Sequence, residues 1–85
     1  MASKRILKRN VNDMVIDVVE ECFTIQLFDE KKTDATEKLI DEVANFQDGI
    51  LSEIHAAKKK SDFKTITATI ETKAIEFVEK LNALG

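Results

Sequence analysis

The stretch Val11–Phe28, VNDMVIDVVEECFTIQLF, is the part of the chain where apolar residues are densest. From Leu7 onward, apolar side chains recur at spacings of three and four, which places them on one face of a helix. This main stripe consists of Leu7, Val11, Met14, Val18, Cys22 and Ile25. We therefore predict a first helix over residues 4–28, around which the other elements are arranged.

Polar residues within this segment leave an alternative open. Asn10, Asn12 and Asp13 favour helix caps and turns over helix interiors, so a kink or a fresh helix start is conceivable near residues 10–13. The apolar stripe keeps its phase across them. This favours one helix, or two nearly collinear ones.

A second apolar stripe follows a short polar connection. Thr33 or Asp34 is the expected N-cap, and Asp34 and Glu37 have the spacing of a capping box. Gly49 would ordinarily indicate a turn, but the stripe continues in phase across it. We predict one helix over residues 34–59, at a cost of about 1 kcal/mol for the glycine. Its stripe consists of Leu39, Val43, Phe46, Ile50, Ile54 and Ala57.

The last third of the chain has the most regular apolar spacing. Ser61 or Asp62 is the expected cap of a third helix over residues 62–84. Residues 64–72, KTITATIET, alternate like a half-buried strand, but no other segment offers this strand a partner. We predict a helix throughout, with a stripe made of Phe63, Ile66, Ile70, Ala74, Phe77, Leu81 and Leu84.

Composition and length support an all-α fold in one domain, residues 1–85. The chain is 44% hydrophobic and 34% charged, with two Gly and no Pro, unlike a disordered tail or a turn-rich β protein. Three helices of similar length joined by short polar connections pack antiparallel. The sequence therefore predicts an up-down-up three-helix bundle.

The first helix carries more apolar surface than such a bundle needs. An apolar arc of about 100° suffices, whereas the flanking residues widen the arc of this helix to roughly 200°. Together with weaker counterparts on the second helix, they form a candidate interface of Ile16, Val19, Phe23, Leu27, Ile40 and Leu51. They are either the ordinary edge of the core or an exposed patch that binds another protein, a small apolar ligand or a second copy of the chain.

Charge is distributed unevenly along the chain. Residues 1–9 contain four cations and no acid, whereas residues 10–30 contain six acids and no cation. The candidate anion-binding residues are Lys4, Arg5, Lys8 and Arg9. Nucleic acid or an anionic partner is the alternative ligand class, but a sequence pI near 5.1 and the absence of Trp and Tyr weigh against nucleic acid.

No residue pattern predicts catalysis, a cofactor or a metal site. Cys22 lies on the main stripe next to Glu21, so we expect a buried thiol and not a nucleophile. His55 has no Cys or second His nearby, which argues against zinc. Glu42 and Glu53 are the only acids near an apolar stripe, and we expect both to reach the surface.

The sequence also bears on location. One cysteine rules out an internal disulfide, and no apolar signal-peptide core follows the N-terminal cations. The longest uncharged run, Cys22–Phe28, is far shorter than the ~20 apolar residues of a membrane span. We expect a cytoplasmic protein.

The N-terminal third shows a resemblance to known sequences. The pattern Lys4-Arg5-x-Leu7-Lys8-x-x-Val11-Asn12, followed by the run 18–23, resembles a group of short bacterial proteins without an assigned function. The resemblance implies a small helical bacterial domain and supplies no activity or ligand. The sequence as a whole predicts a protein-interaction or self-associating module without catalytic activity.

Overall fold

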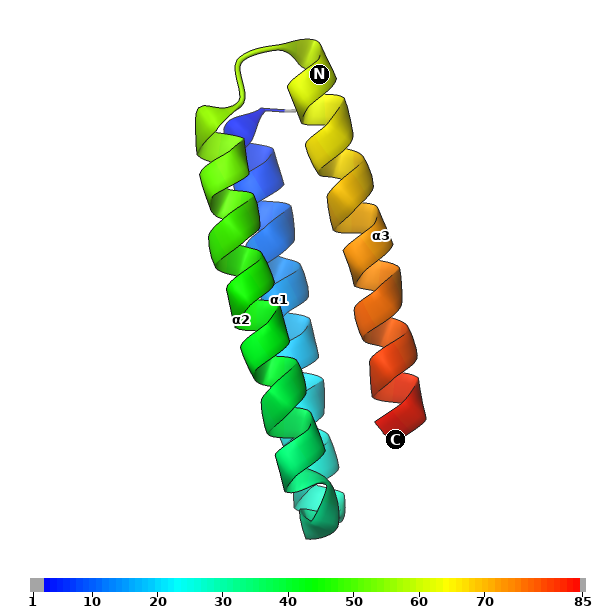
Figure 1. Ribbon diagram of the computed structural model, residues 1–85. Coiled ribbons are helices and arrows are strands. Elements are labelled where there is room, and N and C mark those ends of the chain that lie inside the picture. The colour runs from blue at the N-terminus through cyan, green and yellow to red at the C-terminus, as the bar shows by residue number, and fades with distance from the viewer. Residues whose placement is uncertain (1–2, 85) are drawn as a thin grey trace.

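The computed structural model describes residues 3–84 and consists of three long helices packed side by side (Figure 1). The elements are α1 (Lys4–Phe28), a short 3-10 helix η1 (Glu30–Lys32), α2 (Thr33–Ala56) and α3 (Lys60–Leu84). Successive helices run in opposite directions, and residues 3–84 contain no strand. The predicted all-α up-down-up bundle is confirmed.

The two doubtful segments are both helical. α1 continues without a break through residues 10–13, where the Nε2 of Gln47 on α2 donates to the Oδ1 of Asn12 over 2.9 Å. α3 includes all of residues 64–72. Thr65 and Thr69 fit a helix here because each hydroxyl donates to the carbonyl four residues earlier. These bonds satisfy both hydroxyl donors within the helix.

Gly49 also lies within a helix, as predicted. α2 continues through it, and a Cβ added at this position would meet no atom within 4 Å. No close contact within the described part of the chain therefore requires a glycine at this position.

The predicted cap of α2 was wrong, although the helix begins within one residue of the predicted start. The helix begins at Thr33 with Lys32 in the N-cap position, and no side chain caps it. The Asp34–Glu37 capping box predicted from the sequence does not form a cap because η1 leads directly into α2. The Thr33 N–H bonds the carbonyl of Glu30, and the Thr33 hydroxyl donates to the same carbonyl over 2.7 Å. The 3-10 turn thus supplies partners that a side-chain cap would otherwise supply.

The connection between α2 and α3 also differs from the prediction. α2 ends at Ala56 and not near residue 59, and α3 begins at Lys60 and not at Asp62. Asp62 therefore lies in the first turn of α3, where its Oδ2 accepts the backbone N–H groups of Lys58 and Lys59, both over 3.1 Å. These two bonds lower the pKa of the Asp62 carboxyl, and its charge suits the helix N-terminus.

The core lies along the common axis of the three helices. Its buried apolar residues are Leu7, Val11, Val15, Val18, Cys22, Leu39, Val43, Ile50, Ile54, Ala57, Ile66, Ile70 and Phe77. Val15 was absent from the predicted stripe. It is buried because α1 contacts both other helices, so its buried arc is wider than one stripe. The rings of Phe46 and Phe77 meet edge to face with centroids 5.9 Å apart and join α2 to α3.

Candidate interaction surface

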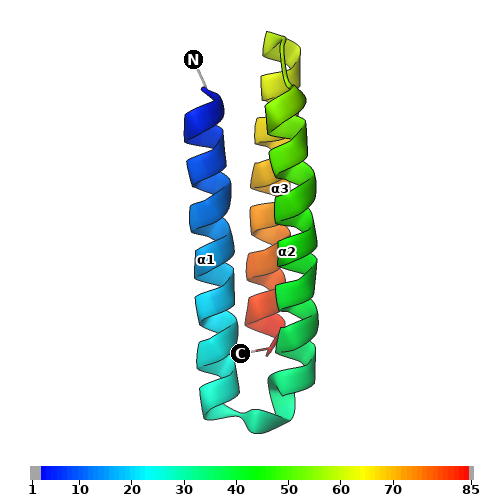
Figure 2. The ribbon, with the colours of Figure 1, turned by 90° about the vertical axis from the view of Figure 1, so that its left-hand side faces the viewer.

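The predicted interface residues belong to α1 and α2, the two helices that stand in front in Figure 2 with α3 behind them. Val19 lies seven residues from both Asn12 and Gln26, and these two residues hydrogen-bond across to α2. Seven residues are nearly two helical turns, so Val19 lies on the same edge of α1. On α2, Ile40 lies seven residues before Gln47 and Leu51 lies four after it, so both lie on the edge that faces α1.

The structure divides the six predicted residues into two sets. Val19, Ile40 and Leu51 are partly buried and pack against the core, so they are the edge of the core. Ile16, Phe23 and Leu27 are 53%, 54% and 84% exposed, respectively. We call this second set the outward row: spacings of seven and four align its members, and Phe23, five residues after Val18, lies about 140° around the helix from the main stripe.

Polar contacts hold the helix pair beneath this row. Gln26 Nε2 donates to the hydroxyl of the fully buried Thr36 over 2.7 Å. The same hydroxyl is 2.9 Å from the carbonyl of Thr33 and 3.0 Å from that of Lys32, so it accepts from Gln26 and shares its one donor between two carbonyls of its own helix end. Sequence reasoning missed this buried threonine, although its spacing of three from Leu39 continues the α2 stripe.

The predicted anion-binding residues lie at the N-terminal end of α1. Lys4 Nζ donates to the carbonyl of His55 over 2.8 Å. A cation there suits the negative end of the α2 dipole, which gives Lys4 a structural role at the end of the neighbouring helix. Arg5, Lys8 and Arg9 are exposed. Arg9 lies seven residues before Ile16 and so continues the outward row towards this end.

The residues considered for catalysis or metal binding are either buried in the core or exposed on the surface. Cys22 is completely buried, and burial, followed by the charge of Glu21, raises the pKa of its thiol. His55 is exposed. Glu42 Oε2 accepts from Lys80 Nζ over 2.5 Å on the surface between α2 and α3. Within residues 3–84 no three His, Cys, Asp or Glu side chains are grouped so that they could hold a metal ion.

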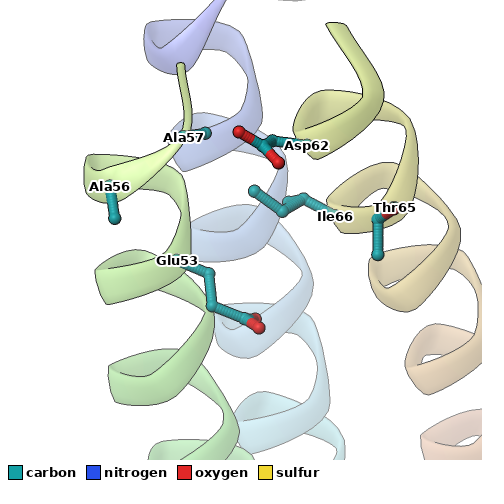
Figure 3. Close-up of a pocket in the computed structure, with 6 residues that line it drawn as sticks. All are labelled: Glu53, Ala56, Ala57, Asp62, Thr65 and Ile66. Atoms are coloured by element: carbon teal, nitrogen blue, oxygen red, sulfur yellow. The ribbon is translucent and has the colours of Figure 1, made fainter. Parts of the chain in front are cut away.

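A hollow of about 290 Å³ lies between the end of α2 and the start of α3 (Figure 3). Figure 3 shows the carboxylates of Glu53 and Asp62 on its rim, contributed by different helices, and Ile66 between them. Asp62 already accepts two backbone N–H groups with one oxygen. The arrangement is therefore a helix cap with an exposed glutamate nearby.

A second groove, which sequence reasoning missed, runs between α1 and α3 and has a volume of about 400 Å³. One wall carries Asp13, Asp17 and Glu21, and Val18 and Leu81 are among the apolar residues that line it. The spacing of four between these acids could have indicated one acidic row along α1. Their charge makes this side of the bundle unsuited to anions.

No family model, curated protein or solved structure matches the chain. The resemblance of the N-terminal third to short bacterial helical proteins therefore stays a prediction. Across residues 3–84, every helix lacks an apolar run long enough to cross a bilayer.

Proposed function

We propose that this chain is a protein-interaction module that binds its partner through the outward row of α1 and the α1–α2 edge beside it. The observation that carries this proposal is the exposure of Ile16, Phe23 and Leu27 in one row, while the core of the bundle is formed by other residues. Single exposed apolar residues are ordinary on proteins, but aligned ones commonly mark a binding surface. The function requires no catalytic group.

Phe23 is the expected anchor of this surface. It stands in the middle of the outward row, and an aromatic side chain contributes a large contact area with few rotatable bonds. Beside the row, the partly buried Val19 and Ile40 supply an apolar floor. A partner that covers Phe23 therefore also covers surface that the bundle leaves only partly buried.

The proposal is tested by placing the photoreactive amino acid p-benzoylphenylalanine at position 23 in cells that express the chain. Position 75 is the matched control, because Ile75 is 61% exposed but lies on α3, away from the α1–α2 edge. We expect a protein adduct of defined mass from position 23 and none from position 75. No adduct from either position, or the same adducts from both, would overturn the proposal.

A second candidate function is binding of an anionic partner by Arg5, Lys8 and Arg9, which are all exposed at one end of the bundle. Binding of this kind weakens steeply with salt, because it releases counterions. A titration with mixed DNA and RNA at low ionic strength tests it. Binding that weakens as salt is added supports this candidate, and absence of binding removes it.

A further inference from the structure

The charges of the bundle separate towards its two ends. Asn12 bonds Gln47, and Glu42 bonds Lys80, so these pairs mark equal heights on neighbouring helices. One half of the bundle, residues 3–16 and 45–77, then contains nine Lys or Arg and six Asp or Glu. The other half, residues 17–44 and 78–84, contains four Lys or Arg and ten Asp or Glu. The bundle has a positive half, net +3, and a negative half, net −6.

The same polarity is present on the α1–α2 side itself. The exposed cations Arg5, Lys8 and Arg9 lie at one end of it. Towards the other end, exposed acids flank the apolar residues, with Glu20 on α1 and Glu37 and Asp41 on α2. Ile16 therefore lies near the middle of this side, and Phe23 and Leu27 lie among the acids towards its other end. A partner that fits this surface must carry acids at one end and bases at the other.

We infer that the partner is a second copy of this chain, packed side by side on the α1–α2 side with its charged ends reversed. This inference rests on the function proposed above for that surface. A two-fold axis across the middle of the surface places the basic end of each copy over the acidic end of the other, and it does so twice. The opposite orientation would place like charges together at both ends.

The dimensions of the bundle require a side-by-side contact. Its Cα atoms extend over 45 × 17 × 16 Å, so one long side offers about 770 Å² and one end offers about 270 Å². A stable interface of standard size buries about 800 Å² on each partner. Only full overlap along the long side comes close to that area. End-to-end stacking, which the charges alone would also permit, does not.

Sedimentation equilibrium of the full chain across the micromolar range tests this inference. We expect a monomer–dimer equilibrium that Ile16→Ser weakens roughly tenfold or more, since each dimer loses two buried isoleucines. Ile75→Ser, which removes a similarly exposed isoleucine from α3, should leave the equilibrium unchanged. Equal weakening by both variants would overturn the inferred surface.

Charge reversal tests the orientation. With the ends reversed, each of two double variants should by itself weaken dimerisation roughly tenfold or more: Arg5→Glu/Arg9→Glu and Glu37→Lys/Asp41→Lys. Mixing the two variants should restore dimerisation, because each then meets a partner of opposite charge. Neither variant should lose helix content, because all four positions are exposed. With like ends together, each variant alone would dimerise as tightly as the original chain. The mixture of the two variants would then dimerise more tightly than the original chain.

The two proposals can fail separately. A chain that stays monomeric at high micromolar concentration overturns the homodimer. If the photoreactive group at position 23 then joins a different protein, the proposed function stands with another partner. If it joins nothing, both proposals fail.

Discussion

The inward and outward faces of α1 have similar side chains and opposite surroundings. Leu7 on the inward face is 3% exposed, and Leu27 on the outward face is 84% exposed, although both are leucines of the same helix. Cys22 and Phe23 differ in the same way at adjacent positions: the first is completely buried and the second is 54% exposed. Burial here depends on the direction in which a residue points and not on its hydrophobicity.

Between the two faces lies an edge that is joined to α2 by polar contacts. Asn12 and Gln26 bond Gln47 and Thr36, and no buried side-chain nitrogen or oxygen within residues 3–84 lacks a partner. Hydrogen bonds are directional, so these contacts add a constraint on the height of α1 against α2 beside that of the apolar packing. The edge thereby holds the outward row in a defined position.

The largest expected difference between the two faces is in folding stability. Leu7→Ala should lower the free energy of unfolding by about 2–5 kcal/mol, because it leaves a cavity in the core. Leu27→Ala should change it by no more than about 0.5 kcal/mol, because the side chain is already in water. Urea unfolding of the two variants measures the difference. Comparable losses would show that the outward row supports the fold.

A smaller effect is expected at the edge. Thr36→Val keeps the shape of the side chain but removes the acceptor of the Gln26 amide, so we expect a loss of about 1 kcal/mol. Thr65→Val is the matched control, since that hydroxyl is exposed and bonds only the Ser61 carbonyl within its own helix. Thermal or urea unfolding compares the two. Equal losses would mean that the bond to Gln26 contributes nothing.

The smallest expected effect on stability concerns the ionisation of Cys22. Burial raises the pKa of this thiol above its ordinary value of 9.0. The neutral, buried thiol therefore makes its full contribution to stability below pH 9.0, and this contribution is lost as the pH rises through the raised pKa. The unfolding free energy of the original chain should therefore fall more steeply above pH 9.0 than that of Cys22→Ala. Parallel pH profiles would contradict this prediction.

The rate of alkylation compares the solvent exposure of the adjacent positions 22 and 23 directly. The buried thiol of Cys22 should react with iodoacetamide only when the chain unfolds, so that dilute urea accelerates the reaction. In the double variant Cys22→Ala/Phe23→Cys, the thiol is exposed and should react at once in the folded protein. Similar rates for the two thiols would show that the inward face of α1 is open to solvent.

Much of this fold was predictable from the sequence because apolar periodicity is a local property. The spacing of Leu7, Val11 and Val18 predicted α1, and the same reasoning carried the helices correctly through Gly49 and residues 64–72. The spacing of Ile16, Phe23 and Leu27 left two alternatives open, the edge of the core or an exposed patch, and the structure exposes all three. No local signal showed that Val19 would be partly covered, because its burial depends on α2.

The sequence by itself determined the number of helices, their approximate bounds and the separation of basic from acidic segments, because these follow from residue type and spacing within one element. Only the tertiary structure decided what depends on neighbouring elements. It buried Val15 and Thr36, moved Asp62 into the first turn of α3 and grouped three acids beside the α1–α3 groove. The physical reason is that burial, capping and the alignment of charged ends arise between helices, so the spacing along one helix can suggest them but does not decide them.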